Sequence, residues 1–254
     1  MSRDRRHIRR FTLIELLVVV ALTSMLMAVG VPAFIRMIRG NKVDECARGI
    51  KLGLEQAQMR AASERCRVAV IFPNGRVTSG SETGKVSQSL APYRMGGFRS
   101  AYVKAASNGS FEFIRWIDPE WRNMPNGAML ARIARSGSDV KRGADGDVTG
   151  CTESIDEDLA GANALMAVTG VKSDGGANLN VGDHSAIVFN PYGGIAGSNG
   201  LSFGNARLFL LVSEAVVEGD VVKYPTANTS GNGRTSNFKV LRVNNVTGRV
   251  EFYE

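Results

Sequence analysis

Histidine is almost missing from this chain of 254 residues, which contains only two, His7 and His184. The second stands in the run Asp-His-Ser at 183–185, and three consecutive side chains point in different directions, so they do not form a catalytic triad. No Cys-x-x-Cys pair or His/Cys cluster indicates zinc. The glycine-rich stretches 80–85 and 193–197 match neither a phosphate-binding loop nor a dinucleotide fingerprint. The sequence therefore predicts that the protein is not an enzyme.

Cysteine is scarce as well, with three residues, Cys46, Cys66 and Cys151. If residues 46–66 form one helix, its two cysteines lie about 30 Å apart and cannot bond to each other. A disulfide between Cys66 and Cys151 is possible, and free buried thiols are the alternative.

Acidic residues are rare at the N-terminus, where residues 1–10 contain five Arg and one Asp. Subtracting this net charge of +4 from the +7 of the whole chain leaves +3 for residues 11–254. Much of the high isoelectric point therefore belongs to the first ten residues and does not indicate a nucleic-acid-binding surface.

Charge is also missing from Leu16 to Phe34, inside the apolar run 11–38. These 19 residues would span about 28 Å as a helix, close to the hydrocarbon thickness of a bilayer. Glu15 stands at the edge of the run, although a carboxylate at the centre of a membrane costs about 2.5–3.5 kcal/mol. A partner for Glu15 is therefore expected. A plain signal anchor, or a secretory signal cleaved near Ala28-Val29-Gly30, would explain the apolar run but not this carboxylate.

The sequence Phe-Thr-Leu-Ile-Glu at 11–15, after a basic leader, resembles the N-terminus of type IV pilins and type II secretion pseudopilins. The resemblance implies that the leader is cut between Arg10 and Phe11 and that Phe11 is N-methylated. Glu15 then becomes the fifth residue of the mature chain. In the family, the glutamate at this position pairs with the N-terminal amine of a neighbouring subunit. Counted from Phe11, Pro32 is residue twenty-two of the mature chain, a position at which the family usually has proline. The family normally has glycine immediately before the cut, whereas this sequence has Arg10.

Arginines that flank a membrane segment stay in the cytoplasm, so the residues after Phe34 are expected on the other side. The resemblance then implies a bacterial inner-membrane protein with a single span and a periplasmic or external head. It implies as partners other pilin or pseudopilin subunits, a prepilin peptidase, an inner-membrane assembly platform and membrane lipid. DNA is not an expected partner under this interpretation.

Residues 41–66 favour a helix with one apolar stripe, because apolar residues recur every three or four positions at Val43, Cys46, Ile50, Leu54, Ala57 and Ala61. Gly49 and Gly53 in this helix are packing contacts or mild bends. One helix is expected over 11–65, lipid-compatible over 11–38 and amphipathic over 39–66.

Residues 67–254 are expected to form a β-rich head, because many segments alternate apolar and polar residues. Strands are predicted at 68–72, 111–117, 128–133, 185–189, 207–212, 238–243 and 249–253. The last two should form a hairpin through residues 244–248. Long loops are expected near 78–110 and 136–183. The predicted fold class is α+β, with a long N-terminal helix packed on an antiparallel sheet, as in pilins.

The head motifs Ile187–Gly193 and Leu241–Val250, the latter containing Thr-Gly-Arg, are similar to the pseudopilin H / FimT group of minor subunits. Six acidic residues crowd positions 145–158, and Asp145 and Asp147 are calcium candidates, with a solvated loop as the alternative. No other cofactor is expected. Trp116 and Trp121 indicate core packing at a strand end or an aromatic partner site.

Three functions follow from this interpretation. The first is a structural minor pilin or pseudopilin, which assembles into a type II secretion pseudopilus or a type IV pilus. The second is a DNA-binding minor pilin, because the C-terminal hairpin offers Arg234, Lys239, Arg242 and Arg249, although Glu251 and Glu254 share that tail. The third is an adhesive minor pilin whose long loops bind a receptor.

Overall fold

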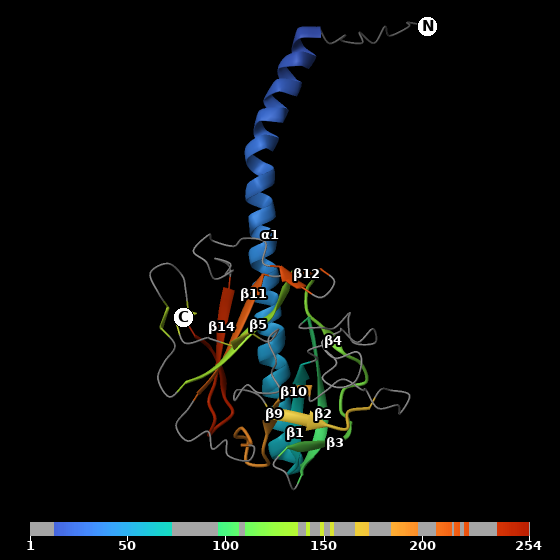
Figure 1. Cartoon of the computed structure of the whole chain (residues 1–254). Coiled ribbons are helices and arrows are strands. Elements are labelled where there is room, and N and C mark those ends of the chain that lie inside the picture. Colours follow the sequence, from blue (N-terminus) through green and yellow to red (C-terminus); the bar gives the residue numbers. More distant parts are fainter. Residues whose placement is uncertain are drawn as a thin grey trace, which may run out of the picture. The chain divides into compact units, whose positions relative to one another are not determined.

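The computed structural model describes most of the predicted helix and strands (Figure 1). The described residues are 13–72, 96–106, 110–136, 141–142, 148–149, 153–154, 166–172, 184–197, 207–214, 216–218, 221–223 and 238–253. The chain divides into two compact units, Met1–Gly40 and Asn41–Glu254.

The helix α1, Leu13–Glu64, runs without interruption through residues of both units. Its bounds agree with the helix predicted over 11–65. It ends where Arg65 adopts a left-handed backbone conformation with φ 53°, and where the Cys66 amide donates to the Ala61 carbonyl at 3.2 Å. A left-handed residue of this kind is a common helix terminator, and glycine is its usual occupant.

The first sheet of the unit Asn41–Glu254 has strand order β1-β10-β9-β3-β2-β4. Its strands are β1 (Arg67–Phe72), β2 (Gly97–Ala105), β3 (Phe111–Trp116), β4 (Arg122–Asn123), β9 (Met166–Thr169) and β10 (His184–Phe189). A further pairing of β1 with β2 closes five of these strands into a ring. All its pairs are antiparallel except β3 with β9, which are parallel.

The second sheet has strand order β15-β14-β11-β5-β8 and is antiparallel throughout its described pairs. Its strands are β5 (Ala128–Ser136), β8 (Glu153–Ser154), β11 (Arg207–Glu214), β14 (Phe238–Val243) and β15 (Val250–Tyr253). Two short hairpins pair β6 (Lys141–Arg142) with β7 (Val148–Thr149), and β12 (Val216–Glu218) with β13 (Val221–Lys223).

The α+β class is confirmed, and each of the seven predicted strands has a counterpart. The predicted extent of the two long loops was wrong, because each range contains a strand. Residues 97–105, expected within a loop near 78–110, form β2, which pairs with β1, β3 and β4. Residues 166–169, expected within the loop near 136–183, form β9. Both strands join the ring of the first sheet, so the ring depends on strands that the sequence did not reveal.

The predicted apolar stripe of α1 lies in the main core of this unit. Val43, Cys46, Ala47, Ile50, Leu54, Ala57 and Ala61 are buried and share one hydrophobic cluster with residues of both sheets. Figure 1 shows this part of α1 running beside both sheets. Gly53 is a packing contact, because a Cβ there would overlap the Phe98 ring, with Cζ only 2.6 Å away.

Candidate functional site

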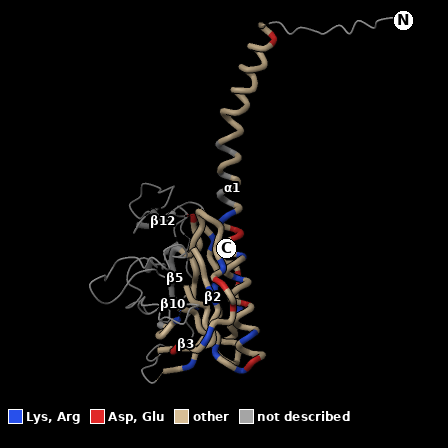
Figure 2. The backbone as a smooth tube through the Cα atoms, turned by 90° about the vertical axis from the view of Figure 1, so that its right-hand side faces the viewer, with Lys and Arg blue, Asp and Glu red and all other residues tan. Residues whose placement is uncertain are grey.

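The apolar part of α1, Leu13–Val31, is long and apolar enough to span a membrane, and it is not buried within its own unit. Its large side chains are exposed, for example 83% of Leu13 and 74% of Leu26. Figure 2 shows this stretch almost without charge. A segment with this much exposed apolar surface needs lipid or other apolar helices around it.

The two hydroxyl groups in this segment are satisfied by the helix itself. Thr23 donates to the carbonyls of Val19 at 2.9 Å and Val20 at 3.0 Å, and Ser24 donates to Ala21 at 2.8 Å. In hydrocarbon an unsatisfied polar group costs several kcal/mol, so these bonds make the segment compatible with a bilayer.

Glu15 lies in the first turn of α1 with an exposed side chain. A carboxylate at this end is favoured by the helix dipole, which carries partial positive charge at the N-terminus. The favourable interaction of Glu15 with the helix dipole is compatible with its predicted pairing with the N-terminal amine of a neighbouring subunit. Arg10 and Phe11, the predicted processing residues, lie outside the described residues. At Pro32 only the backbone is described, and α1 continues through it.

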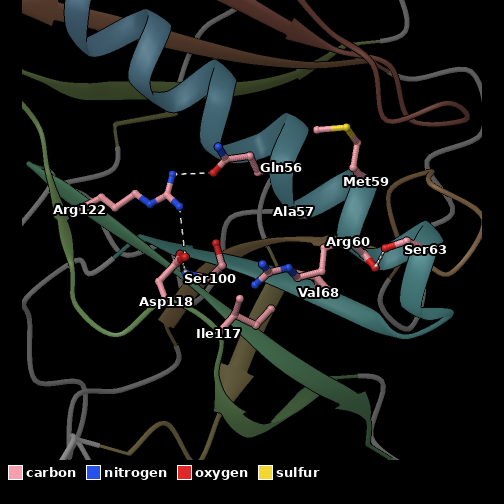
Figure 3. A pocket seen from close by; sticks show the side chains of 10 residues that line it. All are labelled: Gln56, Ala57, Met59, Arg60, Ser63, Val68, Ser100, Ile117, Asp118 and Arg122. Carbon is pink, nitrogen blue, oxygen red and sulfur yellow. Dashed lines mark hydrogen bonds and ion pairs between the residues drawn. The ribbon is translucent and has the colours of Figure 1, made fainter.

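A second candidate site is a cleft of about 530 Å³ on the unit Asn41–Glu254, which we call the α1 cleft (Figure 3). It is lined by Gln56, Ala57, Met59, Arg60, Ser63, Val68, Ser100, Ile117, Asp118 and Arg122.

Arg122 lies across one side of the α1 cleft. It donates to Gln56 Oε1 at 2.7 Å and to Asp118 Oδ1 at 3.1 Å, while Asp118 Oδ2 accepts the Ser100 amide at 3.1 Å. On another side, Arg60 Nε lies 3.8 Å from a carboxylate oxygen of Glu64. The α1 cleft thus combines two partly exposed guanidinium groups, one carboxylate and an apolar lining.

A third feature is a pair of turns, residues 190–194 and 244–248, which we call the double turn. Each begins with asparagine, whose Oδ1 accepts two amides. Asn190 accepts from Tyr192 at 2.9 Å and Gly194 at 3.1 Å, and Asn244 accepts from Val246 and Thr247, both at 3.0 Å.

The two turns are joined to each other and to α1. The Ile195 amide donates to the Asn245 carbonyl at 2.8 Å, and Gln58 Nε2 donates to the Thr247 carbonyl. Tyr192 projects from these turns and is 93% exposed, and Val246 is 72% exposed. The hairpin turn at 244–248 was predicted from the sequence. Its contact with residues 190–194 was not, because about 50 residues separate the two segments and no local sequence pattern indicates that they meet.

The tryptophan pair is partly buried and packs against the core. Trp116 and Trp121 lie with ring centroids 5.4 Å apart, and both pack against the main core. Trp116 Nε1 donates to the Lys172 carbonyl at 2.8 Å, and the Arg99 guanidinium lies 4.3 Å from the Trp116 ring. Core packing at a strand end is therefore the role that the contacts support.

The basic residues proposed for DNA are paired with acids where they are described. Arg242 donates to Glu251 at 2.6 Å, Arg249 lies 3.0 Å from Glu251, and Lys239 lies 3.4 Å from Asp44. The hydrogen bond from Arg242, followed by the charge of Arg249, lowers the pKa of Glu251. Arg234 and Glu254 lie outside the described residues. These ion pairs reduce the positive potential that phosphate contacts need.

The remaining predicted sites are only partly described. Asp145, Asp147 and Cys151 lie outside the described residues, so the calcium site stays a prediction. Cys46 and Cys66 are free thiols, so the structure does not form the Cys66–Cys151 disulfide and agrees with the free-thiol alternative for these two residues. Among the residues that the structure describes, no group of three or more His, Cys, Asp or Glu side chains is placed to hold a metal ion.

Comparison of the chain with protein-family models, with curated proteins and with solved structures finds no match.

Proposed function

We propose that this protein is a minor subunit of a type IV pilin-like filament, either a type II secretion pseudopilus or a type IV pilus. The observation that carries the proposal is Glu15 in the first turn of an exposed apolar helix, within the sequence Phe-Thr-Leu-Ile-Glu and after a basic leader. The resemblance to pilins explains this carboxylate, which an ordinary membrane anchor does not need.

The second part of α1 supports the same proposal. The helix continues without a break from the apolar segment, and its residues from Val43 onward belong to the core of the unit Asn41–Glu254. A filament subunit needs a membrane segment and a folded head in one chain, and the continuous helix α1 contributes residues to both.

The proposed mechanism is physical and involves no catalysis. Leader cleavage between Arg10 and Phe11 would leave a free amine four residues before Glu15. Extraction of Leu13–Val31 from lipid exposes its apolar side chains. Packing against the apolar segments of neighbouring subunits replaces the lost lipid contacts. The carboxylate of Glu15 would be neutralised by the amine of a neighbour.

Replacing Glu15 tests the proposal. Glu15→Ala should insert into the membrane at least as well as the original chain, because it removes a charge from the edge of the apolar segment, where a charge is unfavourable. It should nevertheless lose incorporation into filaments, measured as cross-links to neighbouring subunits. Mass spectrometry of the same membrane extracts should find chains that begin with methylated Phe11.

The matched control is Ser24→Ala, which removes a hydroxyl that already bonds to its own helix and should incorporate normally. Normal incorporation of Glu15→Ala would exclude Glu15 as the assembly residue. An intact leader on all chains would instead favour a membrane-anchored protein that does not enter the filament.

A further inference from the structure

We propose that the α1 cleft binds a peptide segment of another protein, in which a carboxylate stands next to an apolar side chain. The carboxylate belongs either to an acidic side chain or to the free end of a chain, and both sources present the same group to the cleft. This inference goes beyond the proposed filament function, because assembly through Leu13–Val31 and Glu15 needs no ligand site on the unit Asn41–Glu254.

Arg60 is the cation of the α1 cleft whose charge is less compensated. Its side chain is 47% exposed, and the carboxylate oxygen of Glu64 lies 3.8 Å from its Nε. That distance is longer than a hydrogen bond, and exposed pairs of this kind contribute little to stability. Glu64 also accepts the hydroxyl of Tyr102. The planar guanidinium of Arg60 can therefore donate two parallel hydrogen bonds to an incoming carboxylate.

The second guanidinium, that of Arg122, neutralises the carboxylate already in the cleft. Arg122 donates to Asp118 Oδ1 at 3.1 Å, and Asp118 Oδ2 accepts the amide of Ser100 at 3.1 Å. The Asp118 side chain is only 13% exposed, so it repels an incoming anion weakly. Figure 3 shows Arg122 and Arg60 extending into the cleft from opposite sides, with Ser100 between them in this view. The hydroxyl of Ser100, a residue that is 6% exposed, offers one more donor.

The rest of the lining suits a peptide better than a small inorganic anion. Ala57, Val68 and Ile117 offer apolar contacts, and Met59, which is 62% exposed, is an adaptable side chain for packing against the residue beside the carboxylate. Gln56 Oε1 already accepts a hydrogen bond, which leaves its NH₂ group as a donor for a peptide carbonyl. The volume of about 530 Å³ is within the range of pockets that hold organic ligands.

Methyl NMR of the full chain in detergent micelles, with isotope-labelled methionine, tests this proposal through the Met59 methyl group. The probe is the blocked peptide acetyl-Gly-Leu-Glu-Gly-amide, and acetyl-Gly-Leu-Gln-Gly-amide is its uncharged match. We expect the first to shift the Met59 signal saturably and the second to bind about tenfold more weakly, because it lacks a charge-assisted hydrogen bond. Tighter binding of acetyl-Gly-Leu-Gly with a free carboxylate than of its amide and of the glutamate peptide would support the proposal and identify a chain end as the source.

Two arginine variants locate the binding site. Arg60→Met should weaken binding of the glutamate peptide about tenfold. Arg48→Met is the matched control, because it removes an exposed arginine from the same helix that does not line the α1 cleft, and it should leave binding unchanged. Both positions are exposed, so neither variant should disturb the fold.

The same titrations can overturn the proposal. Equal binding of the glutamate and glutamine peptides, equal effects of the two variants, or no saturable shift of Met59 with any of the peptides would exclude a carboxylate site in the α1 cleft. Inorganic phosphate that binds as tightly as the glutamate peptide would show a general anion site and exclude peptide recognition. None of these outcomes changes the filament proposal, which is decided separately by the cross-links of Glu15→Ala.

Discussion

At the scale of single residues, Gly248 decides how closely the two turns can approach. Its φ is 70°, and a Cβ there would overlap the Gly193 carbonyl oxygen. Gly248→Ala should therefore lower the free energy of unfolding by more than about 1 kcal/mol, measured by denaturant unfolding in detergent. Gly49→Ala is the control, because a Cβ at Gly49 has nothing within 4 Å, and alanine should stabilise that helix by about 0.5–1 kcal/mol. Equal effects would exclude the close contact.

Cys46 is a second residue whose behaviour follows from burial. Burial, assisted by the charge of Glu45, raises the pKa of its thiol from 9.0 to about 12. The folded state thus favours the neutral thiol, and this contribution to stability is present below pH 9 and lost as the pH rises toward 12. We expect Cys46 to stay unmodified by a thiol reagent at pH 8 until the chain unfolds, whereas the half-buried Cys66 reacts earlier. Peptide mass mapping separates the two, and early modification of Cys46 would contradict its burial.

The residues of the candidate sites were predictable to different degrees. Glu15 could be found from the sequence, because a carboxylate beside an apolar run is conspicuous without any tertiary information. Tyr192 and Arg122 could not. The exposure of Tyr192 depends on contacts between turns 50 residues apart, and Arg122 reaches Gln56 only because α1 packs beside the first sheet.

At the scale of elements, β2 shows why a strand can escape prediction. Its first five residues are all buried, and they include Arg99 and Ser100. Polar residues at buried positions remove the alternation that marked the other strands. Arg99 is accommodated because it donates to the Asp118 carbonyl at 3.0 Å and the Pro119 carbonyl at 2.5 Å. By contrast, β14 and β15 were predictable, because a five-residue turn ending in glycine joins two short apolar segments.

Arg99 should therefore be essential to β2 and to the loop that follows β3. Arg99→Met leaves the carbonyls of Asp118 and Pro119 without this donor, and we expect a loss of about 2–4 kcal/mol in the free energy of unfolding. Arg115→Met is the control, because Arg115 is exposed and lies over the Tyr102 ring at 4.7 Å. It should cost less than about 1 kcal/mol. Calorimetry of both variants measures the difference, and similar melting temperatures would contradict a special role for Arg99.

At the scale of the whole molecule, the two units differ in what stabilises them. The buried core begins at Val43, and no residue of Leu13–Val31 is buried in the structure. The apolar segment therefore requires a membrane or other helices. The unit Asn41–Glu254 contains the amphipathic part of α1 and both sheets, which together bury a core of ordinary size for a domain.

A shortened chain that begins at Asn41 should consequently fold by itself. We expect it to be soluble, to unfold in one cooperative transition and to be monomeric, because it lacks the exposed apolar segment Leu13–Val31. A chain that begins at Glu55 is the control. It lacks Val43, Cys46, Ile50 and Leu54, so it exposes the faces of both sheets that this part of α1 covers. Calorimetry and sedimentation distinguish the two chains. Aggregation of the first, or an unchanged melting temperature of the second, would show that α1 does not form the core of this unit.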